Sequence, residues 1–298
     1  MEIHTPVLVE EIKAHLNLKE GDKVIDATLD GGGHARVFLE AVGKSGAVLG
    51  IERDPEMFKI ISARKEEEGG IWKNLRIVNE NFRDIRSVAL KEKFLAPNAI
   101  LFDLGVSRWH FEASGKGFSF KREDEPLMMN FGKEEGSAAQ ILNSYPKDGL
   151  LEIFSDYGEL DRRASRVLAE AIVNFRKHNK ILTVGDLKIV AEGAILNRRH
   201  IAQAFQALRI VVNDELGAIE EGIRGAYEIL PAGGKMAVIS YHSLEDRIVK
   251  NFFRKMKDED GAELGAKKPI MASAEELKRN PSANSAKLRI LIKKIKIL

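Results

Sequence analysis

Three acidic residues, Asp26, Glu52 and Asp103, each end a short apolar run that predicts a buried strand. Phe82 lies just beyond a further run of this kind, at 75–78. Ligands of open α/β sheets bind outside the carboxyl ends of parallel strands, so we expect these four residues to line one cleft. A lone phenylalanine is more often a core residue, and the joint placement of all four is therefore the stronger signal.

A glycine loop, Gly31-Gly32-Gly33, separates the strand at 23–25 from a helix that starts near residue 35. Strand, glycine loop and helix form the usual opening of a nucleotide-binding α/β domain. Glycine permits positive φ and a close approach of the backbone to a ligand. The free N–H groups at the start of the helix would then face that ligand.

Three ligands compete for this loop. A triphosphate loop needs glycine where Phe38 stands, and a dinucleotide loop needs its third glycine where Arg36 stands. The loop of S-adenosylmethionine enzymes is looser, because no pyrophosphate is wrapped. Glu52 follows the glycines by about 20 residues, the separation expected of a carboxylate that holds ribose hydroxyls. The alternative is that Glu52 and Asp54 are solvated turn residues before a helix.

The composition of the 298-residue chain predicts about two domains of a globular protein. No apolar run approaches the ~18 residues of a membrane span, and the N-terminus lacks the pattern of a signal peptide. We therefore expect a cytoplasmic protein without a membrane partner. The chain has no cysteine and no HExxH pair, so we predict no metal site. A net charge of only +2 means that nucleic-acid binding requires local basic patches.

The alternation of strands and helices breaks near residue 110 and resumes near 222. Between these points the apolar spacing is helical, and Thr183 with Asp186 resembles a capping box. We predict an α/β domain made of 1–110 and 222–298, with a helical substrate-recognition domain inserted at 111–221. The insertion opens with a glycine-rich aromatic loop at 115–120. This loop suits a lid, a base-stacking surface or a packed interdomain linker.

The last predicted strands carry two further groups of interest. Ser243 and Asp246 resemble a helix cap after the strand at 235–240, and this leaves His242 near the ligand cleft. From residue 277 onward the chain has no acidic residue, and alternation at 287–292 predicts an edge strand. Lys287 and Arg289 on this strand either discourage edge pairing or contact phosphates.

Taken together, the motifs resemble the bacterial ribosomal RNA small-subunit methyltransferase H family almost end to end. The matching segments are 4–8, 26–28, 32–34, 50–55, 81–82, 102–107, 117–120, 205–210, 213, 215–216, 242–247 and 285–289. The resemblance implies a class I methyltransferase fold, a Rossmann-like and mostly parallel sheet with an antiparallel final strand. It also implies methylation of a cytosine N4 in 16S rRNA of the 30S subunit, with S-adenosylmethionine as cofactor. The oligomeric state does not follow from the sequence, and a homodimer is the assembly we consider.

The candidate functional residues fall into two groups. The cofactor residues it implies are Gly32, Gly33, His34, Glu52, Phe82, Asp103 and His110. For the RNA substrate we consider Phe118 and Phe120 as base-stacking residues, with Arg209, Asn213, Lys287 and Arg289 as further contacts. A cytosine within a helix could not reach the pocket, so the target should be unpaired or flipped out.

Cytosine N4 is a poor nucleophile because its lone pair is delocalised into the ring. An acceptor for the N4 hydrogen would restore the nucleophile and later remove a proton. Asp103 is the first candidate for this catalytic role, and His242 is the second.

Several positions depart from the family pattern. Asp30 replaces a usual glycine, His110 a usual glutamine, and Met128 and Asn130 replace an acid and an arginine. The expected substrate-binding motifs therefore match the family pattern less well than the expected cofactor-binding motifs. One alternative is a diverged paralogue that methylates another target, or that binds cofactor and RNA without this activity. A protein or small-molecule methyltransferase and an NAD-dependent oxidoreductase are the other two.

Overall fold

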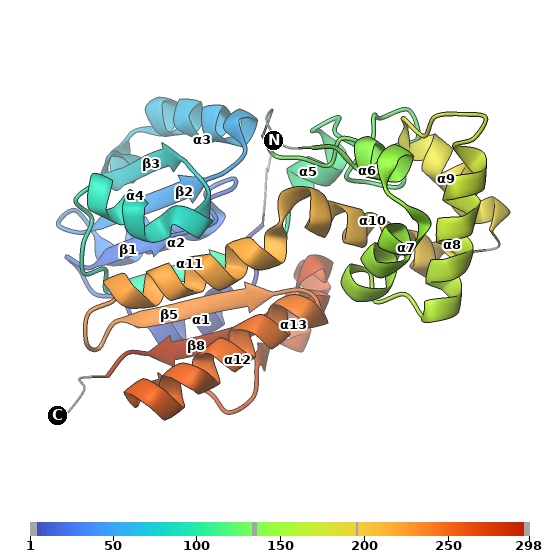
Figure 1. The fold of residues 1–298 in the computed structure, drawn as a ribbon. Helices are drawn as coiled ribbons and strands as arrows, with labels where there is room; N and C mark the ends of the chain where they lie inside the picture. The colour runs from blue at the N-terminus through green and yellow to red at the C-terminus, as the bar shows by residue number, and fades with distance from the viewer. Residues whose placement is uncertain (1–4, 133–135, 195, 295–298) are drawn as a thin grey trace. The chain divides into compact units, whose positions relative to one another are not determined.

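The computed structural model describes residues 5–132, 136–194 and 196–294, and the chain divides into two compact units (Figure 1). Residues 1–105 and 216–298 form the first unit, and residues 106–215 form the second. Both breaks precede the boundaries expected at 110/111 and 221/222. Val106 already packs with the hydrophobic core of the second unit, whereas Ile219 and Ile223 pack against the sheet of the first unit. No helix in the described ranges is long and apolar enough to cross a membrane.

The first unit is built on one mixed sheet with the strand order β3-β2-β1-β4-β5-β8-β6, and β7 also pairs with β8. The strands are β1 Lys23–Asp26, β2 Ala47–Glu52, β3 Leu75–Asn79, β4 Ala99–Asp103, β5 Lys235–Ser240, β6 Glu263–Leu264, β7 Ile270–Met271 and β8 Lys287–Ile292. The five strands from β3 to β5 pair in parallel, and β8 is antiparallel to β5. This sheet confirms the α/β class and the antiparallel final strand.

Helices cover both faces of the sheet, as the buried strands of a parallel sheet require. Because side chains alternate across a strand, Ile100 and Phe102 of β4 face one core, and Leu101 faces the other. The first core is closed by α4 Ile85–Lys91, α11 Glu215–Ile229 and α12 Ser243–Asp260. The second is closed by α1 Val9–Leu16, α2 Gly33–Val42 and α3 Pro55–Glu68. The remaining short elements of this unit are η1 Gly70–Asn74, η2 Phe82–Asp84, α13 Ala274–Arg279 and η4 Pro281–Ser285.

The expectation that 287–292 forms an edge strand is wrong. This segment is β8, which pairs with β5 on one side and with the short β6 and β7 on the other. Leu288 and Ile290 are buried, and Lys287 and Arg289 alternate with them. Edge protection therefore does not explain these two cations.

The second unit is helical in its described residues. Its elements are α5 Arg108–Glu112, α6 Ala138–Ser144, α7 Lys147–Glu152, the π-helical turn η3 Ile153–Tyr157, α8 Arg162–Phe175, α9 Val184–Gly193 and α10 Arg198–Asn213. The predicted capping box at α9 is confirmed, because Thr183 caps the Asp186 N–H and the Asp186 side chain accepts from Thr183 N. Such reciprocal bonds satisfy donors that a helix start leaves free.

Candidate active site at the carboxyl edge of the sheet

Asp103 ends β4 and is held by groups from neighbouring segments. Its Oδ1 accepts a hydrogen bond of 2.8 Å from the Tyr241 hydroxyl, and its backbone N–H donates to Thr28 Oγ1 at 2.7 Å. The carboxylate is about nine-tenths buried. Burial, followed by the negative charge of Asp103, raises the pKa of Tyr241, so this hydroxyl stays a proton donor. The sequence placed Tyr241 at a strand end but gave no signal for this bond.

His34, in the first turn of α2, has a ring that is buried and incompletely satisfied. Its Nε2 lies 3.4 Å from Asp103 Oδ2, and its ring stacks on Phe38. Neither ring nitrogen has a hydrogen-bond partner among the residues that the structure describes. Buried polar atoms are almost always paired, so an unpaired imidazole beside a carboxylate marks a place for a polar ligand group.

Glu52 ends β2 and turns its carboxylate into the protein. Oε2 accepts from Asp30 N at 2.8 Å, and Oε1 accepts from Asp54 N at 2.7 Å. Burial, followed by the charge of Asp30, raises the pKa of Glu52 to about 8. Each carboxylate oxygen can accept a second hydrogen bond, so two ligand hydroxyls could still be held.

The glycine loop has a conformation that glycine favours, but the protein itself fills the space around it. Gly32 has φ +76°, and a Cβ there would collide with Ile61 and Trp72. A Cβ on Gly33 would collide with Pro6. Close packing against the protein is thus one reason for both glycines. Their approach to a ligand stays a prediction. Asp30 has φ +46°, which explains why glycine suits this position in the family loop.

Phe82 and His110 complete the predicted cofactor set and belong to different units. Phe82 begins η2 in the first unit, with its ring edge-on to Phe102 at 5.6 Å. His110 lies in α5 of the second unit, where its Nδ1 is 2.8 Å from Ser107 Oγ. The structure thus brings Asp103 and His34 together in the first unit. It assigns His110 to the other.

His242, the second catalytic candidate, has a structural role. It is the N-cap of α12, and its Nε2 lies 3.1 Å from Glu245 Oε1. Glu245 Oε2 in return accepts from His242 N and from Tyr241 N. The predicted cap by Ser243 and Asp246 is wrong by one residue, because the equally spaced pair of His242 and Glu245 forms the box instead.

Phe118 is not an exposed stacking residue. It is 4% exposed and packs against the rings of His110 and Phe131, which also contact each other, within the core of the second unit. Phe120, two residues later, is half-buried, with its ring edge-on to Phe205. Only Phe120 of this pair remains available to a ligand.

Arg209 and Asn213 of α10 also act inside the second unit. Arg209 forms two parallel hydrogen bonds to Glu215, of 2.9 and 3.0 Å. Asn213 is 1% exposed and donates to the carbonyl oxygens of Met129 and Arg209, while its Oδ1 accepts from Phe131 N. It therefore holds the strained turn at Met129, where φ is +55°. Direct substrate contact by Asn213 is not compatible with this burial.

The two cations of β8 differ from each other. Arg289 donates two hydrogen bonds to Asp246, of 2.7 and 3.0 Å, and both side chains are largely buried. Burial alone would raise the pKa of Asp246. The hydrogen bonds and the positive charge of Arg289 outweigh burial and lower this pKa. Lys287 is half-buried and is the one still suited to a phosphate contact.

Comparison with known proteins shows the family to which this chain is related. The model of the MraW methylase family matches residues 1–294, although His4 of the first motif lies outside the described residues. This chain belongs to that family. It is 42% identical, over 97% of its length and 96% of the relative's, to the ribosomal RNA small subunit methyltransferase H of Dictyoglomus thermophilum. The protein of the same name from Leptospira interrogans is 43% identical, with 93% and 84% covered.

Among solved structures, an rRNA methylase from Streptococcus thermophilus resembles the chain with a TM-score of 0.44 and 11% identity, covering 96% of each chain. The family membership thus comes from the sequence match.

Proposed function

We propose that this protein transfers a methyl group from S-adenosylmethionine to the N4 amino group of a cytosine in 16S rRNA of the small ribosomal subunit. The family match over 1–294 carries the proposal, because the relatives that span nearly the whole chain bear the name of small-subunit rRNA methyltransferases. We further propose that the first unit holds the cofactor and that the second recognises RNA. Light scattering can test the homodimer that we consider.

The carboxyl edge of the sheet fits the proposed cofactor. The unpaired ring nitrogens of His34 and the carboxylate of Asp103 suit the polar, cationic methionine end. The Glu52 carboxylate suits the ribose hydroxyls, and Phe82 offers an apolar side to the adenine. The bound cofactor would supply an electrophilic methyl group on its sulfonium.

The protein's own chemical task is to align the amino group and accept its proton. Asp103 is the better candidate, because its carboxylate ends β4 beside His34 and is held in place by the Tyr241 hydroxyl. His242 is engaged with Glu245 and fits a positioning role at the start of α12. A base that is unpaired or flipped out of an RNA helix could reach this edge of the sheet.

Nucleoside mass spectrometry tests this proposal. Small subunits from a strain lacking the modification are incubated with the protein and S-adenosylmethionine, and the rRNA is digested. We expect N4-methylated cytidine, mapped to one fragment of 16S rRNA. Methylation of another nucleoside would replace the target, and no transfer to subunits would reject the activity.

A second candidate is a paralogue that binds cofactor and RNA without this activity, favoured by the segment at 127–130. Leu127 and Met129 are buried, Met128 is exposed, and Asn130 donates to the carbonyl oxygen of Gly136. The acid and the arginine expected here are thus replaced by neutral side chains, which cannot form ion pairs. Retained cofactor and subunit binding without methyl transfer would favour this candidate.

A further inference from the structure

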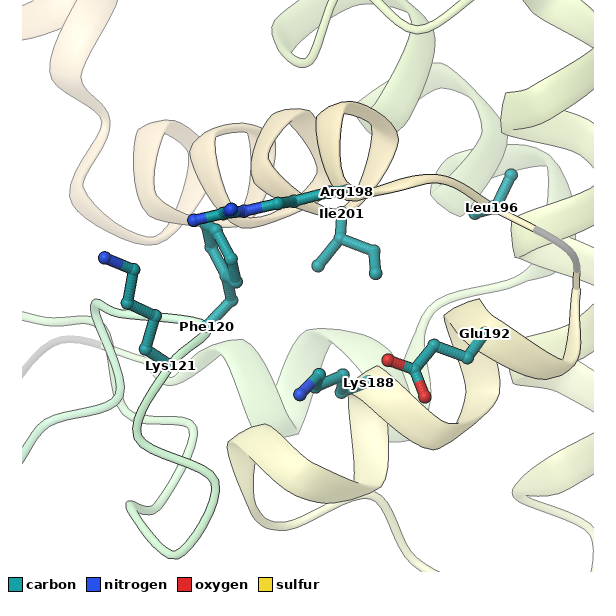
Figure 2. A pocket seen from close by; sticks show the side chains of 7 residues that line it. All are labelled: Phe120, Lys121, Lys188, Glu192, Leu196, Arg198 and Ile201. Carbon is teal, nitrogen blue, oxygen red and sulfur yellow. The ribbon is translucent and has the colours of Figure 1, made fainter.

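A cavity of about 350 Å³ lies within the second unit, away from every residue implied by the family resemblance except Phe120. Figure 2 shows it between the loop around residue 120, helix α9 and the start of α10. Its lining residues are Phe120, Lys121, Lys188, Glu192, Leu196, Arg198 and Ile201. This volume falls within the range of small-ligand sites.

The interior of this cavity is apolar, and two flat groups, an aromatic ring and a guanidinium, line it. Ile201 is buried and points into the cavity, and Phe120 forms one wall (Figure 2). The guanidinium of Arg198 lies over the Phe120 ring, 5.7 Å from its centroid. An aromatic ring and a guanidinium plane are the two surfaces on which proteins stack unpaired bases.

The rim of the cavity is mostly cationic. Lys121 and Arg198 are exposed, and Lys188 forms an ion pair with Glu123 just outside the lining. Glu192 is the one acidic residue among the lining side chains. A carboxylate can accept hydrogen bonds from the amino edge of a base, while the cations suit the phosphates on either side.

Positively charged side chains also lie at the N-termini of two helices, where they oppose the helix dipole. Helix α8 begins with Arg162 and Arg163, and α10 begins with Arg198 and Arg199, with no acid in either first turn. A positive charge there opposes the positive end of the helix dipole. His200 of α10 lies 4.0 Å from Asp161, the cap of α8, so the two starts are neighbours. Asp161 offsets part of the repulsion between these cations and the helix dipoles, and a polyanion bound at this surface would offset more of it.

We propose that this cavity binds one unpaired nucleotide of the RNA substrate, with the base against Phe120, Arg198 and Ile201 and the phosphates on Lys121 and the helix starts. The inference rests on the proposed function and adds a subsite in the second unit. The nucleotide is a recognition element, because the methyl-transfer residues assigned above lie in the first unit.

The test uses the full chain and a fluorescein-labelled single-stranded oligoribonucleotide, compared with the same strand annealed to its complement. Phe120→Leu keeps an apolar side chain against Phe205 but removes the stacking face. We expect it to weaken binding of the single strand roughly 5- to 150-fold, with little change for the duplex. Arg198→Ala should weaken binding of both and lower the salt slope by about 0.7.

Tyr145→Leu is the matched control, since Tyr145 is an exposed aromatic residue of the same unit that does not line the cavity. Thermal unfolding of each variant verifies the fold. As an independent measurement, RNA containing 4-thiouridine should crosslink to a peptide that carries Phe120 or Arg198.

The two proposals fail differently. If wild-type protein methylates subunits, but Phe120→Leu binds the single strand unchanged and the crosslinks lie elsewhere, the cavity is not a nucleotide site. If wild-type protein neither binds the RNA nor methylates subunits, the proposed function fails, and this inference falls with it.

Discussion

The two units differ in how directly their sequence motifs correspond to accessible chemistry. In the first unit, Asp103 and Glu52 stand at strand ends, where the sheet itself directs them to one edge. In the second unit, Phe118 and Asn213 are buried structural residues, although they lie in family motifs. A motif on a strand end thus lies where the sheet can present it to a ligand, whereas a motif in a helical unit can serve packing alone. The following predictions test this difference, beginning with the largest effect.

Replacing the Asp103 carboxylate should have the largest effect on methyl transfer. Asp103→Asn keeps the size of the side chain but loses the proton acceptor, and we expect kcat to fall about 10²- to 10⁴-fold. Tyr241→Phe removes one hydrogen bond to the same carboxylate and should cost much less. Single-turnover kinetics at saturating cofactor measures both. An active Asp103→Asn variant would transfer the acceptor role to another group.

Phe118→Ala should act on stability. Truncating a phenylalanine that is 4% exposed costs about 3–5 kcal/mol of the free energy of unfolding. Urea unfolding of this variant and of Phe120→Leu should separate a core residue from a surface residue. If Phe118→Ala kept its stability and lost RNA affinity instead, Phe118 would be a stacking residue after all.

Glu52 should make the first unit less stable at high pH. Its folded pKa of about 8 lies above its ordinary value of 4.5, so the folded state binds the extra proton. The stability from the neutral form is complete below pH 4.5 and is lost as the pH rises through about 8. At about 1.4 kcal/mol per pKa unit, the loss is a few kcal/mol. Urea unfolding at several pH values should show a flatter profile for Glu52→Gln; equal profiles would reject the raised pKa.

The two cations of β8 should separate into a structural and a binding residue. Arg289→Ala leaves Asp246 buried without its partner and should cost about 1.5–3 kcal/mol of unfolding free energy. Lys287→Ala should leave stability nearly unchanged and lower the salt slope of RNA binding by roughly 0.7 to 0.9. Unfolding and anisotropy titrations on the same two variants measure this contrast. If Arg289→Ala lowered the salt slope and Lys287→Ala did not, Arg289 would be the phosphate contact.

The sequence predicted those features that depend on neighbouring residues. The strand ends at Glu52 and Asp103 and the cap at Thr183 follow from local patterns, and all three are present. Which of Phe118 and Phe120 enters the core depends on rings brought together by the fold, so alternation along the loop could not decide it.

Contacts between segments that are distant in the sequence could not be predicted from it. The partner of Arg289 is Asp246, 43 residues away, and Tyr241 reaches Asp103 across 138 residues. The cavity at Ile201 likewise joins three segments that share no motif. In each case the pairing is set by tertiary packing, which composition and periodicity do not encode.

Calorimetric titration with S-adenosylhomocysteine tests most directly whether the strand ends of the first unit hold the cofactor. Above pH 8, where Glu52 is ionised, Glu52→Ala removes charge-assisted hydrogen bonds worth roughly 1.5–3 kcal/mol, so its Kd should rise about 10- to 150-fold. Glu80→Ala, an exposed acid just after β3, is the control and should bind like the wild type. Equal affinity of Glu52→Ala and the wild type would contradict this assignment.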